Sequence, residues 1–339
     1  MSAKKYFVYE LKKALFAIGS IALIMTAITV TRIITDYYVF GYRIESGVDV
    51  SSFMGGLLAA VVPVWMFSYK MKKRSVDLFY SLPLKRSKIL GVKYLLGLIA
   101  LYAPYTTAFW LGALAAAIKY PSYVFDGVYY IPTYFAALPA LFCIFSLSSF
   151  VFTRAERVID GVVFIVFWAF ALFAVMSVLQ KIFGYAIAAD MYMPTAPLNA
   201  VANYFIMRIE IPGMYVRESI ETTVNRAVGF SITGLIAIAA SIFLFLTEKR
   251  SRAENIGGVS ASPFGYKVMI PLLTVCTIAY LDIVDDIYEV LLVVIAASAA
   301  FMLSALYMHT FKIGKVQAIV LGGSVALGIL LAVVFGLTL

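Results

Sequence analysis

The sequence predicts an all-α, polytopic membrane protein, and three observations support this fold class. Of the 339 residues, 63% are hydrophobic and only 13% are charged. Soluble domains contain about 45–50% apolar and about 25% charged residues, and such a domain would have to expose large apolar patches here. The apolar residues also gather in charge-free stretches long enough to cross a bilayer as helices. These features exclude water-soluble enzymes, disordered tails and disulfide scaffolds.

Charge-free windows of about 18 residues or more identify the expected spans. These windows are residues 14–31, 50–69, 94–118, 127–153, 161–180, 227–247, 290–308 and 316–339. A ninth stretch, residues 268–281, is shorter and would span with a snorkelling Lys267 at its start. Residues 191–207 contain Pro194 and Pro197, so we expect a re-entrant or surface element there.

The distribution of basic residues predicts the orientation. The chain has 27 Lys and Arg against 18 Asp and Glu, which gives a net charge of +9. With nine spans and a cytosolic N-terminus, most basic residues fall in cytosolic segments, as the positive-inside rule requires. The C-terminus is then outside, whereas it returns to the cytosol if residues 268–281 do not span. Because the charge serves orientation in the lipid bilayer, we expect no nucleic-acid partner.

The N-terminal residues 4–13 place four lysines among Tyr6, Phe7, Tyr9 and Leu11. This composition predicts an interfacial helix along the inner leaflet. No small-residue cleavage site follows the first apolar run, so we expect the first span to be retained.

Two common motifs for phosphate and zinc binding are absent from the sequence. It contains neither Gly-x-x-x-x-Gly-Lys-Ser/Thr, which cradles phosphate, nor His-Glu-x-x-His, which binds zinc. The one histidine, His309, excludes a histidine-based metal cluster. Cys143 and Cys276 lie in apolar runs and are expected to act as small hydrophobic residues. We therefore expect no catalytic residue, no metal and no cofactor in this chain.

Residues 70–93, between the second and third spans, form the most informative segment and read KMKKRSVDLFYSLPLKRSKILGVK. Ser75 is a suitable N-cap, and Asp77 falls in the first helical turn, where the helix dipole favours an anion. Pro83 would end this short helix. The sequence thus predicts a capped helix next to the membrane.

The same short helix carries an apolar face. Val76, Phe79 and Tyr80 follow an i, i+3, i+4 pattern, and basic residues flank them on both sides. One alternative is a basic loop that contacts lipid headgroups. That alternative explains the lysines but not the capped apolar helix.

Two other clusters carry charge. Residues 247–258 read TEKRSRAENIGG, and their charged side chains either pair with one another or with a partner protein, or form a solvated turn. The second cluster makes one acidic helical face that would attract cations or a cationic substrate, or else is a solvated outer loop. Its members are Asp282, Asp285, Asp286 and Glu289. Gly55-x-x-x-Ala59 and Gly322-x-x-x-Ala326 have the small-residue spacing of helix-packing sites.

Two segments resemble a known family. Residues 72–90, KKRSVDLFYSLPLKRSKIL, resemble the signature of type-2 ATP-binding-cassette (ABC) permeases from Gram-positive bacteria, with a basic start, an acidic residue, Ser-Leu-Pro and further basic residues. Residues 252–257, RAENIG, are similar to an Arg-x-x-Glu-x-small-Gly segment after span six. The three further spans resemble a branch linked to cell-envelope stress, whose appended extracellular domain we expect to be absent.

The resemblance implies an organisation in three parts. These are a six-span permease core with a coupling helix near residues 75–82 (1–247), a cytosolic connector (248–267) and additional spans (268–339). The coupling helix would dock on a separate ATPase, which holds ATP and Mg²⁺. The implied coupling residues are Arg74, Ser75, Val76, Asp77, Phe79, Tyr80, Ser81, Leu82 and Pro83. The implied connector residues are Arg252, Glu254 and Gly257.

The resemblance also implies a function. The chain would be the permease subunit of an exporter for a lipid, a peptide or an antibiotic-like amphiphile, in the bacterial cytoplasmic membrane. It would act as a homodimer or with a related permease, and would not itself be an enzyme. One alternative is an ion-coupled carrier or channel without an ATPase, which needs ionisable residues inside the spans. Another is a membrane enzyme acting on lipid, for which the acidic face is the only candidate site.

Overall fold

The computed structural model describes most of the helical parts of the chain. The residues described are 2–35, 48–72, 75, 81, 83–119, 130–183, 220–248, 257–258, 262, 265–281, 287–308, 311 and 314–338. Among these residues the regular elements are α-helices and one short 3-10 helix, without a strand. Five of the described helices are long and apolar enough to cross a membrane. The protein is therefore an all-α membrane protein, as predicted.

Contacts divide the chain into two compact units. Unit 1 comprises Met1–Phe150 and Pro194–Ala253, and unit 2 comprises Val151–Met193 and Glu254–Leu339. Contacts thus group residues 151–193 with the C-terminal helices. The sequence-based division at residue 247 follows the family resemblance alone and stays a prediction. The expected re-entrant element at residues 191–207 lies outside the described residues.

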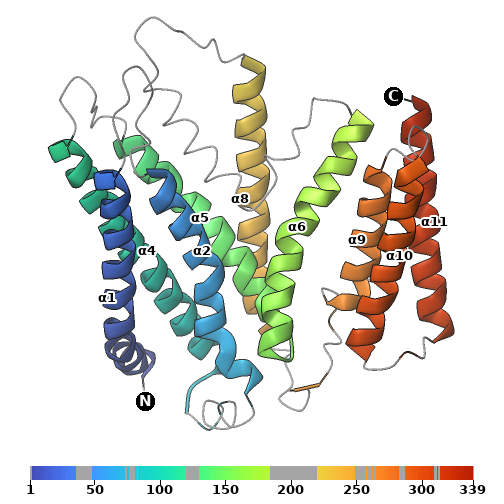
Figure 1. The fold of residues 1–339 in the computed structure, drawn as a ribbon. Coiled ribbons are helices and arrows are strands. Elements are labelled where there is room, and N and C mark those ends of the chain that lie inside the picture. Colours follow the sequence, from blue (N-terminus) through green and yellow to red (C-terminus); the bar gives the residue numbers. More distant parts are fainter. Residues whose placement is uncertain are drawn as a thin grey trace, which may run out of the picture. The chain divides into compact units, whose positions relative to one another are not determined.

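Unit 1 contains four long helices and most of a fifth (Figure 1). They are α1 (Ala3–Thr35), α2 (Val48–Phe67) with the 3-10 turn η1 (Ser68–Met71), α4 (Arg86–Lys119), α5 (Tyr130–Phe152) and α8 (Ile220–Glu248). The predicted interfacial residues 4–13 form the first third of α1, without a break before the apolar part.

Helix α4 forms the centre of unit 1. It packs against α1, α2 and α8, and Tyr102 Oη donates a hydrogen bond of 3.0 Å to the Leu138 carbonyl of α5. Close packing of α2 on α4 requires Gly55, because a Cβ there would lie 2.8 Å from Cδ2 of Tyr105. The expected packing role of Gly55-x-x-x-Ala59 is therefore confirmed, and Ala59 is fully buried.

Unit 2 contains α6 (Val158–Phe183), α9 (Tyr266–Tyr280), α10 (Ile287–Met308) and α11 (Lys315–Thr338). Helix α9 packs against the other three. Its first residue, Tyr266, donates a hydrogen bond of 3.2 Å to Asp160 of α6 and places its ring 4.3 Å from that of Tyr307 in α10. The start of α9 thus lies beside the start of α6 and the end of α10.

The predicted ninth span corresponds to α9, which has 15 residues. At 1.5 Å per residue it is about 22 Å long, shorter than the hydrocarbon core of about 30 Å. Gly328 of α11 allows close packing on it, since a Cβ there would lie 2.8 Å from Cβ of Ile278. The helix is present where the sequence predicts one, and the number of spans stays a prediction.

Candidate functional site

The expected coupling residues lie in a part of the chain that the structure describes at few positions. Ser75, Ser81 and Pro83 are described, and Ser81 and Pro83 are exposed. The Ser75 N–H donates a hydrogen bond of 2.9 Å to the Lys72 carbonyl. The remaining expected residues, Arg74, Val76, Asp77, Phe79, Tyr80 and Leu82, lie outside the described residues.

Buried ion pairs hold both ends of segment 70–93. At the first end, Lys70 of η1 pairs with Glu248, the last residue of α8, and their side chains are 8% and 2% exposed. At the second end, Lys93 Nζ lies 2.7 Å from Glu10 Oε2 of α1, with exposures of 12% and 9%. The segment is therefore fixed at its two ends to two helices with which it is not contiguous in sequence.

Helix electrostatics explain why Glu248 needs a cation. The C-terminus of a helix carries a partial negative charge, so a carboxylate in the last turn is unfavourable there. Desolvation adds to this penalty because the Glu248 side chain is buried. The Lys70 ammonium offsets both effects, and η1 is thereby held against the end of α8.

The two anchors lie close together. Lys93 Nζ is 5.8 Å from the ring centroid of Tyr69, the neighbour of Lys70 in η1. Tyr69 itself is buried, and a desolvated ring attracts a cation more strongly than an exposed one. Lys93 therefore contacts both α1 and η1. We call Glu10, Lys70, Lys93 and Glu248 the anchor residues.

A polar cluster follows directly in α4. The Tyr94 hydroxyl lies 2.9 Å from Ser146 Oγ of α5 and 3.0 Å from Ser241 Oγ of α8. The rings of Phe145 and Phe245 pack around it at centroid distances of 5.1 and 5.6 Å. Consecutive residues of α4 thus hold α1 through Lys93, and α5 and α8 through Tyr94.

Helices α1 and α4 are also joined at their other ends. Lys119 Nζ, at the end of α4, donates to the carbonyls of Ile33 (2.5 Å) and Ile34 (3.1 Å) in the last turn of α1. Carbonyls in the last turn of a helix receive no hydrogen bond from a backbone N–H of the same helix, so the Lys119 ammonium serves as their donor. The two helices therefore run in the same direction side by side. Near this end, Gly112 lets them approach closely, because a Cβ there would lie 2.7 Å from Thr29 Cγ2.

The expected connector residue Gly257 lies in unit 2. Its N–H donates to the Glu156 carbonyl (3.1 Å), and its own carbonyl accepts from Arg157 Nε (2.8 Å). Its φ of 83° is a conformation that glycine adopts without strain. Gly257 is thereby fixed to the turn between α5 and α6. Arg252 and Glu254 lie outside the described residues.

The expected acidic face is described only at Glu289, in the first turn of α10. Asp282, Asp285 and Asp286 lie outside the described residues. In the part of the chain that the structure describes, no three His, Cys, Asp or Glu residues come together as a metal site would require. The acidic face thus stays a prediction.

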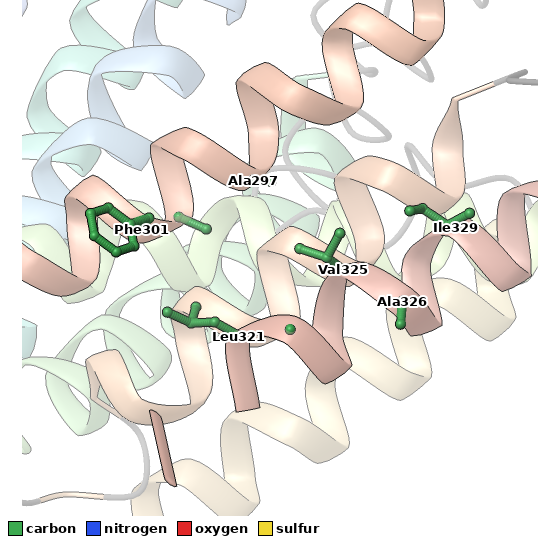
Figure 2. A pocket seen from close by; sticks show the side chains of 8 residues that line it. Ala297, Phe301, Leu321, Val325, Ala326 and Ile329 are labelled. Carbon is green, nitrogen blue, oxygen red and sulfur yellow. The ribbon is translucent and has the colours of Figure 1, made fainter. Parts of the chain in front are cut away.

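An apolar groove of about 380 Å³ lies between α10 and α11 (Figure 2). Gly322 and Ala326, the second expected packing pair, line this groove, and nothing lies within 4 Å of a Cβ placed at Gly322. Gly322 therefore faces open space instead of a packed neighbour. The remaining lining residues are Ala297, Ala300, Phe301, Leu321, Val325 and Ile329.

No protein-family model, curated protein or solved structure matches the chain. The resemblance to ABC permeases consequently rests on the two sequence segments. The anchor residues were missed by sequence reasoning. Glu10 offered a signal, since it is the one acidic residue before Asp36 and lies among four lysines.

Proposed function

We propose that this protein is the membrane-spanning permease subunit of an ATP-driven ABC exporter. A separate ATPase would bind segment 70–93 from the cytosol and carry out ATP hydrolysis. The substrate would be a lipid, a peptide or an antibiotic-like amphiphile, and a second permease, identical or related, would complete the pathway. The N-terminus would be cytosolic, in a bacterial cytoplasmic membrane.

The observation that carries this proposal is the anchoring of segment 70–93. Both ends are tied into unit 1 by buried ion pairs, while Ser81, Pro83 and Lys85 between them are exposed. A loop that only contacts lipid headgroups needs basic side chains but no buried carboxylate partners. A segment that receives force from a partner does need firm attachment to the helices it must move.

The expected docking surface combines apolar and charged residues. Phe79 and Tyr80 would supply apolar contacts in a groove of the ATPase, and the lysines and arginines around them would form a charged rim. Closure of two ATPases on ATP would move both coupling segments. The cavity between two permeases would then switch from inward-open to outward-open.

The distribution of charge argues against an ion-coupled carrier. Such carriers place ionisable residues inside the membrane along the ion pathway. In the described helices, Asp, Glu, Lys and Arg occur in the terminal thirds and not in the middle third. Carboxylate, ammonium and guanidinium groups at mid-span, which an ion pathway would require, are therefore not found in these described helices.

Affinity purification tests the proposal. The tagged protein is purified in mild detergent from its native host, and co-purifying proteins are identified and quantified by mass spectrometry. We expect a stoichiometric ATPase with a phosphate-binding loop, and ATP hydrolysis by the complex. A folded, intact protein without an ATPase would overturn the proposal and favour a self-sufficient carrier.

The docking surface is tested with the double variant Phe79→Asp/Tyr80→Asp. We expect loss of the ATPase from the purified complex, because two buried carboxylates would oppose apolar docking. The control is Phe311→Asp, which makes the phenylalanine-to-aspartate part of this change at an 80% exposed position between α10 and α11. Equal ATPase recovery from both variants would exclude this docking surface.

A further inference from the structure

Segment 70–93 is contiguous with α2 and α4, yet its ion pairs reach α1 and α8. From this arrangement we infer that the anchor residues are positioning residues. Lys93–Glu10 passes displacement of the segment to α1, and Lys70–Glu248 passes it to α8. This inference rests on the proposed function, because it assigns the route by which movement of the docked segment enters the membrane helices.

Buried ion pairs are suited to this task. Packed helices with apolar faces can slide over one another in small shear movements. A buried pair resists separation, since each charge would lose its partner inside a region that water does not solvate. All four anchor side chains are at most 12% exposed. The paired atoms are therefore expected to move together when the segment is displaced.

Helix α1 extends this movement along the length of α4 in unit 1. It has 33 residues, and α4 beside it has 34, so each is about 50 Å long at 1.5 Å per residue. Lys93–Glu10 joins them near one end, and Lys119 joins them at the other. A displacement entering at Lys93 thus moves α1 and α4 as one body.

Helix α8 receives the movement at its last residue. Glu248 ends the helix, and two turns earlier Ser241 is hydrogen-bonded to Tyr94 of α4. The second pair therefore acts on a helix that already has a fixed point on α4. Displacement of Lys70 would tilt the end of α8 about that point.

The test uses the complex purified with its ATPase and three single-cysteine reporters, in a background where Cys143 and Cys276, both buried, are replaced by alanine. Ser87→Cys reports on the segment, Lys13→Cys on α1 and Leu246→Cys on α8, and all three positions are exposed. The rate of maleimide labelling is measured without nucleotide and after trapping with ATP and vanadate. With intact pairs we expect trapping to change the rate several-fold at each position.

Each pair is then removed as a whole, which leaves neither charge buried without its partner. Glu10→Met/Lys93→Met should reduce the change at Lys13→Cys several-fold, because only Lys119 at the other end then joins α1 to α4, and should keep the changes at Ser87→Cys and Leu246→Cys. Lys70→Met/Glu248→Met should abolish the change at Leu246→Cys alone. The reversed pair, Glu10→Lys/Lys93→Glu, should restore the response of α1. Lys12→Met/Lys88→Met, which removes exposed lysines from the same helices, is the matched control and should leave every response intact.

The outcomes separate the two proposals. Purification of the wild-type protein without an ATPase would overturn the proposed function and this inference with it. An ATPase that binds, together with unchanged responses in α1 and α8 after removal of the pairs, would overturn the inference alone. A trapped complex in which no reporter responds would also overturn it, since the segment would then transmit nothing.

Discussion

The two units differ in how their central helices are held. In unit 1, α4 is joined to its neighbours by charged and polar side chains, at Lys93, Tyr94 and Lys119. In unit 2, α9 has a polar contact at its start, from Tyr266 to Asp160, but is otherwise buried chiefly through apolar and small residues, such as Ile278 against Gly328. Ion pairs and hydrogen bonds hold particular atoms of two helices together, whereas apolar packing requires only that the two helix surfaces fit each other. The comparison indicates that unit 1 is built to keep defined points of its helices in register.

The largest effect is expected when an ion pair of unit 1 is broken. Lys93→Met should lower the free energy of unfolding by about 3–5 kcal/mol, because Glu10 would remain buried without its cation. The double variant Glu10→Met/Lys93→Met should recover most of that loss. Equilibrium unfolding in mixed detergent micelles measures both. If the double variant were as unstable as the single one, side-chain packing would explain the effect and the charge pair would not.

The next largest effect is expected when the close packing of α11 on α9 in unit 2 is disturbed. Gly328→Ala should lower the free energy of unfolding by about 1–3 kcal/mol, since the added Cβ would lie 2.8 Å from Ile278 Cβ and 3.3 Å from the Val275 carbonyl. Gly322→Ala is the matched control in the same helix. It faces open space, and should change stability by at most about 1 kcal/mol in the favourable direction, because alanine is the better helix former. The same unfolding measurement compares the two. Equal effects would contradict the different surroundings of these glycines.

The helices were largely predictable because the bilayer restricts what can cross it. Each predicted span, including the short residues 268–281, coincides with one α-helix. Their lengths were less predictable. The window rule began the first and third spans at residues 14 and 94, whereas α1 begins at Ala3 and α4 at Arg86. The rule stops at charged residues, whereas the helices run through exposed lysines such as Lys12, Lys13 and Lys88, so the predicted interfacial helix over residues 4–13 is continuous with the first span.

The anchor residues were much harder to predict. Their partners are 83 and 178 positions apart in sequence, and many other lysines compete for each carboxylate. Only local signals were available, namely a lone Glu10 among lysines and a Glu248 at the unfavourable end of a helix. Both signals indicate that the carboxylate needs a nearby cation, but neither signal identifies the residue that supplies it. Helix packing in the folded protein places Lys93 beside Glu10 and Lys70 beside Glu248.

The smallest expected effect concerns the hydrogen bonds around Tyr94. Tyr94→Phe keeps the ring against Phe145 and Phe245 but removes the hydroxyl that bonds Ser146 and Ser241. We expect a loss of about 0.5–1.5 kcal/mol in the free energy of unfolding, because hydrogen bonds between membrane helices contribute modestly. Tyr9→Phe, at a 61% exposed tyrosine of α1, is the control and should be neutral.

This last variant also sharpens the contrast between units. Ser241 still donates to the Ala237 carbonyl within α8 (3.0 Å), so loss of the tyrosine hydroxyl leaves that serine a partner. The expected loss of stability therefore arises mainly at Ser146, which is fully buried, and the Tyr94 bonds also set where α5 and α8 meet α4. We accordingly expect Tyr94→Phe to reduce the change in maleimide labelling rate that trapping causes at Leu246→Cys, even though the variant loses little stability. A response equal to that of Tyr9→Phe would mean that apolar packing suffices to fix α8 in unit 1 without the Tyr94 hydroxyl.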